Sequence, residues 1–62
     1  MNLKRLREAK DMTQAELAAA AGVAQSAVGN WESGIRMPTA DKLPKLAAIL
    51  GCTIDELFKK EE

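Results

Sequence analysis

The sequence predicts an all-α fold of five short helices, and three observations support this. Alanine and leucine dominate the apolar residues, and the aromatic residues are limited to Trp31 and Phe58. No stretch alternates apolar and polar residues with the period of two that is typical of a β-strand. Two Thr-x-x-Glu segments, beginning at Thr13 and Thr53, match the capping box that opens helices.

Caps and turns place the first two helices. We expect a helix from about Leu3 to Lys10 with Asn2 as its N-cap. The capping box at Thr13 then begins a second helix. This helix ends at Gly22, because a glycine suits the left-handed conformation of a helix C-cap.

The third helix is expected from about Gln25 to Glu32 and is closed by Gly34. Residues 35–40 follow as a loop. The fourth helix runs through Leu50, and we expect Asp41 to be its N-cap. This choice puts Pro44 at the third helical position, where the N–H that proline lacks has no partner to lose.

The capping box at Thr53 begins a short fifth helix that ends near Lys59. Glu61 and Glu62 lie beyond it, and we expect them to fray. Residues 1–62 are therefore interpreted as a single domain with an ordered core of about residues 2–60.

Composition limits the classes of function. Nine basic residues balance nine acidic ones, so the net charge gives no support to a nucleic-acid partner, although Lys4, Arg5, Arg7 and Lys10 crowd the N-terminus. Without histidine, the single Cys52 can form neither an internal disulfide nor a zinc cluster, which suits the reducing cytoplasm. No apolar run is long enough to span a membrane.

Catalysis is not expected. A nucleophile needs a neighbouring base or a metal, and a chain without histidine and with only scattered carboxylates offers neither. We therefore expect no cofactor, no metal and no small-molecule ligand.

Residues 14–33 have the spacing of a helix-turn-helix motif. Ala18 must be small because the two helices cross there, and Gly22 must turn tightly. Val28 and Trp31 lie about one helical turn apart on an inward face, so Trp31 is interpreted as a core residue rather than a base-stacking one. Met12, Met37 and Cys52 are also expected to pack.

Over residues 3–58 the chain resembles the lambda-repressor-like, Xre-type helix-turn-helix family, which implies DNA binding. It departs from the family at Ala24, where a serine or threonine commonly caps the recognition helix. The resemblance also implies a structural ion pair between Arg7 and Glu32. The segments that carry it are Thr13-Gln14-Ala15-Glu16-Leu17-Ala18, Ala21-Gly22-Val23-Ala24-Gln25, Trp31-Glu32-Ser33-Gly34, Pro38, Leu43-Pro44-Lys45-Leu46-Ala47 and Leu50-Gly51-Cys52-Thr53-Ile54-Asp55-Glu56-Leu57-Phe58.

The third helix carries the expected base contacts. Ser26, Gly29, Asn30 and Ser33 form a small, polar stripe opposite the apolar face. An amide side chain can give adenine a paired donor and acceptor, so Gln25 and Asn30 are the leading base readers and Ser26 follows them. The alternative for each is an ordinary solvated side chain.

Three residues are expected at DNA phosphates. Gln14 begins the second helix, whose free N–H groups and dipole favour an anion. Ser33 ends the polar stripe. Arg36 follows the third helix and is expected at a phosphate or in the minor groove. Thr13 is expected to act first as a cap.

Two hypotheses of function remain open. The leading one is a small transcriptional repressor that binds double-stranded DNA, with a homodimer formed on DNA through Leu57, Phe58 and the helix 4 to 5 region. The alternative is a protein-interaction module, such as an antitoxin or a co-activator-like domain, which zero net charge favours.

Overall fold

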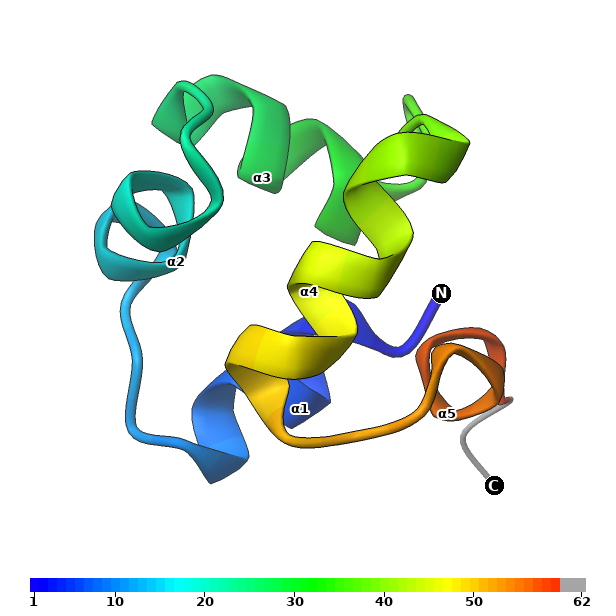
Figure 1. The fold of residues 1–62 in the computed structure, drawn as a ribbon. Helices are drawn as coiled ribbons and strands as arrows, with labels where there is room; N and C mark the ends of the chain where they lie inside the picture. The colour runs from blue at the N-terminus through cyan, green and yellow to red at the C-terminus, as the bar shows by residue number, and fades with distance from the viewer. Residues whose placement is uncertain (60–62) are drawn as a thin grey trace.

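The computed structural model describes residues 1–59, which form five α-helices and one 3-10 turn (Figure 1). No strand occurs in this part of the chain, so the predicted all-α fold is confirmed. The expected fraying of Glu61 and Glu62 lies outside the described residues. In chain order the elements are α1 (Leu3–Ala9), α2 (Gln14–Ala21), α3 (Gln25–Ser33), η1 (Ala40–Lys42), α4 (Leu43–Leu50) and α5 (Ile54–Phe58).

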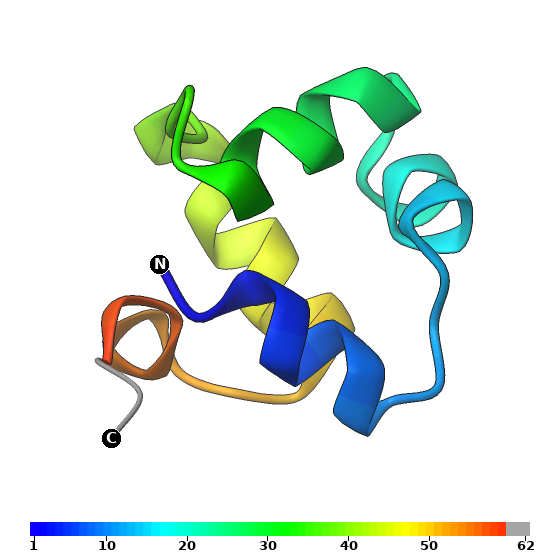
Figure 2. The ribbon, with the colours of Figure 1, turned by 180° about the vertical axis from the view of Figure 1, so that it is seen from behind.

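α4 runs through the middle of the molecule, and the other helices surround it. It packs against α2 and α5, while α3 packs against α2 and α1. The view from behind shows α1 in front of α4 (Figure 2), so α1 covers the side of α4 that faces away in Figure 1. α3 consequently lies at an edge of the structure, with one face turned away from the core.

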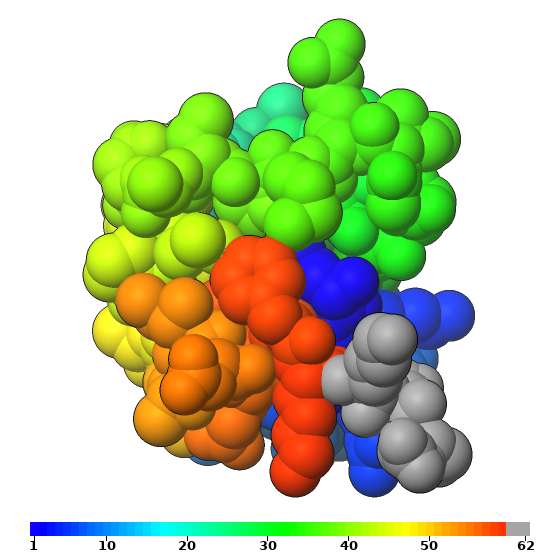
Figure 3. Space-filling view, turned by 90° about the vertical axis from the view of Figure 1, so that its right-hand side faces the viewer, coloured from blue at the N-terminus to red at the C-terminus, as the bar shows by residue number. Residues whose placement is uncertain are grey.

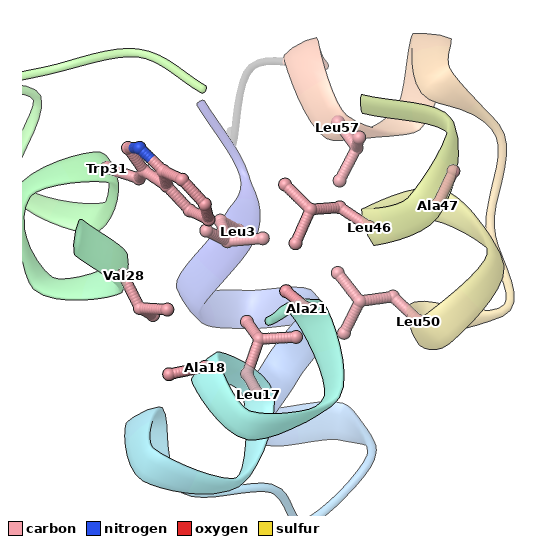
Figure 4. Close-up of a cluster of buried hydrophobic side chains, with 10 residues drawn as sticks. All are labelled: Leu3, Leu17, Ala18, Ala21, Val28, Trp31, Leu46, Ala47, Leu50 and Leu57. Atoms are coloured by element: carbon pink, nitrogen blue, oxygen red, sulfur yellow. The ribbon is translucent and has the colours of Figure 1, made fainter. Parts of the chain in front are cut away.

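The core is a single cluster of mostly aliphatic side chains (Figure 4). Leu17, Leu46 and Val28 are fully buried, and Trp31 lies with them, as predicted. Met12 and Cys52 pack against this cluster, also as predicted. The buried apolar residues are Leu3, Leu17, Ala18, Ala21, Val28, Trp31, Leu46, Ala47, Leu50 and Leu57.

Both predicted capping boxes form. Thr13 Oγ1 accepts a hydrogen bond from the Glu16 N–H at 3.0 Å, and the Glu16 carboxylate accepts one from the Thr13 N–H at 2.8 Å. Thr53 and Glu56 make the same reciprocal pair at the start of α5. The sequence signal for these two helix starts was therefore sufficient, because a capping box involves only neighbouring residues.

Asn2 stands at the N-cap position of α1, but its side chain makes no capping bond. Its φ of −94° and ψ of 28° depart from the extended conformation of a capping residue. The Asn2 N–H instead donates to the carbonyl of Leu57 at 2.7 Å, which ties the N-terminus to α5. The space-filling view shows the end of α5 beside the first residues (Figure 3). The prediction of a side-chain cap was wrong because this tertiary contact sets the backbone.

Asp41 is not the N-cap of α4. It lies inside η1, where its carboxylate accepts a hydrogen bond from the Thr39 hydroxyl. α4 proper begins at Leu43, which puts Pro44 at the second helical position rather than the third. Proline is tolerated there for the expected reason, since the N–H at that position has no intrahelical partner.

Two apolar residues lie where they were not expected. Met37 was expected to pack but is 56% exposed, because the neighbouring Pro38 takes the buried position in an extended segment. Leu57 was expected at a dimer surface but is fully buried in the core, which leaves Phe58, 44% exposed, as the outward residue of that pair. Adjacent residues of a helix point in different directions, so only one of the two can face out.

α3 starts without a side-chain cap, because Ala24 has no side-chain oxygen. Its φ of −72° and ψ of 151° are those of a capping serine.

We expect Ala24→Ser to raise the free energy of unfolding by about 1 kcal/mol and the melting temperature by about 4–8 °C, measured by circular dichroism. Ala19→Ser, on the exposed face of α2, is the control. An equal gain in both variants would contradict the capping explanation.

Candidate nucleic-acid interface

A tight turn holds α2 and α3 against each other. Gly22 has a φ of 73°, a left-handed conformation that few other residues adopt, and the Val23 N–H donates to the carbonyl of Ala18 at 3.0 Å. Ala18 is only 3% exposed where the helices meet. The predicted helix-turn-helix geometry over residues 14–33 is therefore present.

The face of α3 opposite the core carries the expected polar stripe. Gln25, Ser26 and Ser33 are exposed, and Gly29 and Asn30 are half-buried. Within residues 1–59, no hydrogen bond occupies the side chains of Gln25, Ser26 or Asn30. Their donors and acceptors therefore remain available to a ligand on this face.

The loop after α3 is fixed to the helix by one carbonyl. Asn30 O accepts hydrogen bonds from the N–H groups of Ile35 at 3.0 Å and Arg36 at 3.2 Å. The Ser33 hydroxyl also donates to it, at 3.3 Å. Arg36 is exposed at this position, and Ile35 beside it is 72% exposed. The Arg36 guanidinium is thus presented at the end of α3 on a defined backbone.

Arg7 and Glu32, expected to pair, lie together and join α1 to α3. Arg7 Nε donates to Glu32 Oε2 at 2.6 Å, and Arg7 Nη2 donates to Glu32 Oε1 at 3.2 Å. Arg7 Nη1 also donates to the carbonyl of Met12 at 2.7 Å, in the turn before α2. The two side chains are 10% and 5% exposed. This is a forked and nearly buried ion pair.

Gln14 belongs to the same network, which sequence reasoning missed. Its Nε2 donates to Glu32 Oε1 at 3.0 Å. The sequence placed Gln14 at a DNA phosphate because it begins a helix, and no local pattern links it to a residue eighteen positions away. Only the packing of α2 on α3 brings these two side chains together.

A family model described as Helix-turn-helix matches residues 3–57. The chain belongs to this Xre, lambda-repressor-like helix-turn-helix family. The resemblance inferred from the sequence is thereby confirmed.

One relative of this helix-turn-helix chain is the "HTH-type transcriptional activator BcrR" of Enterococcus faecalis. The two are 38% identical over 60 residues, which make up 97% of this chain and 29% of the relative. The chain therefore spans less than a third of the length of that protein.

The ionisation of the network follows from its contacts. Burial by itself would raise the pKa of Glu32, but the hydrogen bonds from Arg7 and Gln14 and the charges of Arg7 and Lys4 outweigh it, and the pKa is lowered. The hydrogen bond to Glu32 in turn raises the pKa of Arg7. Both groups are charged at neutral pH and neutralise each other.

The rest of the described chain offers little other chemistry. Burial raises the pKa of the Cys52 thiol, so it is a weak nucleophile at neutral pH. No group of three or more cysteine, histidine and carboxylate residues within residues 1–59 is placed to hold a metal ion. None of the helices described has the length and apolarity needed to cross a membrane.

The ion pair makes stability depend on pH. Because the folded state lowers the pKa of Glu32 below its ordinary value of 4.5, the pair stabilises the fold above that pH, and this contribution is lost as the pH falls through the folded-state pKa. We expect the free energy of unfolding, measured with urea, to fall as the pH is lowered below about 5.

Glu32→Gln removes this titrating group and leaves the Arg7 charge without its partner. We expect it to lower the free energy of unfolding by about 3 kcal/mol at pH 7 and to flatten the acid dependence. Glu8→Gln, on the exposed side of α1, is the control and changes stability little. The same acid dependence in wild type and Glu32→Gln would disprove this assignment.

Proposed function

We propose that this chain binds specific sequences of double-stranded DNA as the DNA-binding part of a transcriptional regulator. The supporting observation is the polar face of α3, where the side chains of Gln25, Ser26 and Asn30 make no hydrogen bond within residues 1–59, on a helix that the Arg7–Glu32 pair joins to α1. A major groove accommodates a helix of this kind. Membership of the helix-turn-helix family supports the same docking, with α3 in the major groove and α2 across the backbone.

Gln25, Ser26 and Asn30 are the proposed base readers. Gln25 and Ser26 lie in the first turn of α3, the part of a recognition helix that reaches base edges in this docking mode. Asn30 lies further along the stripe and offers both a donor and an acceptor to adenine. Their side chains are free of other hydrogen bonds in the described chain, so contact with bases costs no internal bond.

Gln14, Ser33 and Arg36 are the proposed phosphate contacts. The capping box occupies the N–H groups of Thr13 and Glu16, and the N–H groups of Gln14 and Ala15 find no acceptor within residues 1–59. Such first-turn groups favour an anion. Arg36 contributes the charge, at a phosphate or in the minor groove.

Binding of the domain to DNA at a promoter would regulate transcription of the gene. We propose repression, because a bound domain that covers a promoter needs no further contact to block it. The relative BcrR is named a transcriptional activator, which is the opposite effect on transcription. A reporter gene with the selected site at its promoter distinguishes the two directions by loss or gain of expression.

Pairing on DNA is also proposed. Phe58, 44% exposed, and Ile54, 40% exposed, are the large apolar residues that α5 turns outward, while Leu57 is buried in the core. A two-fold pair would require a palindromic site with half-sites about one helical turn apart. Sedimentation of the free chain at micromolar concentration, expected to show a monomer, and of its complex, expected to show a pair, tests this.

Two observations favour a protein partner as the second candidate. The net charge is zero, and Ile35 and Met37 are 72% and 56% exposed beside α3. A protein-interaction module, such as an antitoxin, would use this apolar loop and would not need Gln25 or Asn30. The selection experiment below separates the two candidates.

Selection from randomised duplexes at about 0.1 M salt tests the base readers. We expect wild type to enrich one sequence, and Gln25→Ala and Asn30→Ala each to lose about 1–3 kcal/mol of discrimination at defined base pairs. Circular dichroism verifies that the variants fold. If the folded wild type enriches nothing, sequence-specific DNA binding is wrong and the protein-partner candidate takes its place.

Arg36→Ala tests the charged contact. If Arg36 binds a phosphate, the variant weakens binding to all duplexes alike and lowers the slope of log affinity against log salt by about one unit. Lys59→Ala, at the far end of the chain, is the control. An unchanged slope would remove Arg36 from the phosphate contacts.

A further inference from the structure

The side chain of Gln14 crosses from the start of α2 to the recognition helix. A Cβ placed on Gly29, in the middle of α3, would lie 3.9 Å from Gln14 Nε2 and 4.0 Å from Gln14 Oε1. The amide therefore lies over the middle of α3 before it reaches Glu32 Oε1 at 3.0 Å. It thus lies beside Gly29 and Glu32 of α3, although it is attached to α2.

The acceptor that Gln14 meets is itself held in place. Both oxygens of Glu32 accept hydrogen bonds from Arg7, and Arg7 is fixed in turn by the carbonyl of Met12. The side chain of Glu32 is 5% exposed, so its carboxylate has little freedom to follow a moving partner. The hydrogen bond from Gln14 consequently fixes the start of α2 relative to α3.

We propose that Gln14 is a positioning residue for specificity, which sets the angle at which α3 meets the bases. One N–H of its amide is held by Glu32, and the second remains for a phosphate oxygen. A phosphate bound at the start of α2 is thereby linked through one side chain to the helix that carries Asn30. This inference rests on the proposed DNA binding and assigns Gln14 a role beyond that of a phosphate contact.

The charges of Arg7 and Glu32 allow Gln14 to contact both Glu32 and a phosphate. A lone carboxylate near the DNA face would repel a phosphate, but the forked pair with Arg7 neutralises Glu32. The amide of Gln14 is uncharged and has two donors, so it can serve both anions. A glutamate at residue 14 would serve neither of them, because an ionised carboxylate only accepts hydrogen bonds.

The test compares wild type with Gln14→Met, which keeps the length of the side chain but removes both N–H donors. Affinity is measured for the selected duplex and for each duplex with one base pair changed, at one stated salt concentration. We expect Gln14→Met to reduce discrimination about tenfold at the base pairs that Asn30 reads. Gln14→Asn retains an amide but is one methylene too short for Glu32, and it should lose discrimination in the same way.

A double-mutant cycle with Asn30→Ala completes the test. If Gln14 acts through the placement of α3, the loss in the double variant is smaller than the product of the two single losses. Binding is measured below the unfolding midpoint of every variant, so that loss of structure does not enter. Ala19→Ser, on the exposed face of α2 and outside the Gln14 network, is the control and should retain discrimination.

Three results would overturn the inference. Equal weakening of all duplexes by Gln14→Met would make Gln14 a phosphate contact alone, and unchanged binding would give it no role. Losses that simply multiply with those of Asn30→Ala would separate it from α3. In each case wild type still selects a sequence, which distinguishes this failure from a wild type that selects none.

Discussion

The ion pair between Arg7 and Glu32 is the interaction on which the arrangement of this fold depends. It joins α1 to α3 and, through the carbonyl of Met12, to the turn before α2. Removing two charges from water is costly, and that cost is offset only when the geometry satisfies both groups. Here the fork of Arg7 and the added bond from Gln14 supply that geometry. The pair therefore fixes which arrangement of helices is adopted.

The Arg7–Glu32 ion pair matters because the hydrophobic core is small. Short chains bury a limited share of their surface, and here much of the buried surface comes from alanine and leucine. Small residues such as Ala18 and Ala21 let helices approach closely, but they fill little volume and specify orientation weakly. Trp31 is the one large aromatic side chain in the core. Directional hydrogen bonds at the edge of the core supply the orientation that aliphatic packing alone leaves loose.

The sequence predicted what neighbouring residues determine. The capping boxes at Thr13 and Thr53 and the inward position of Trp31 depend on spacing within one helix, and the structure bears them out. The errors at Asn2 and Asp41 arose where a distant carbonyl or a preceding 3-10 turn sets the backbone. For the candidate site, spacing identified an exposed polar face on α3, but the bond from Gln14 to Glu32 depends on how two helices cross, which spacing does not encode.

Two of the charges that sum to zero in this chain are paired with each other. Arg7 and Glu32 cancel each other at a nearly buried position, so neither one contributes to the field that a ligand meets. Arg36, exposed beside α3, lies apart from that pair. Release of counterions depends on the cations that meet phosphates, and Arg36 is the one proposed for that contact, so fit must supply more of the affinity in the proposed complex. In the proposed complex with DNA, the residues that hold α3 in place would contribute to binding together with those that touch DNA, because a misplaced helix would have little charge attraction to compensate for poor contacts.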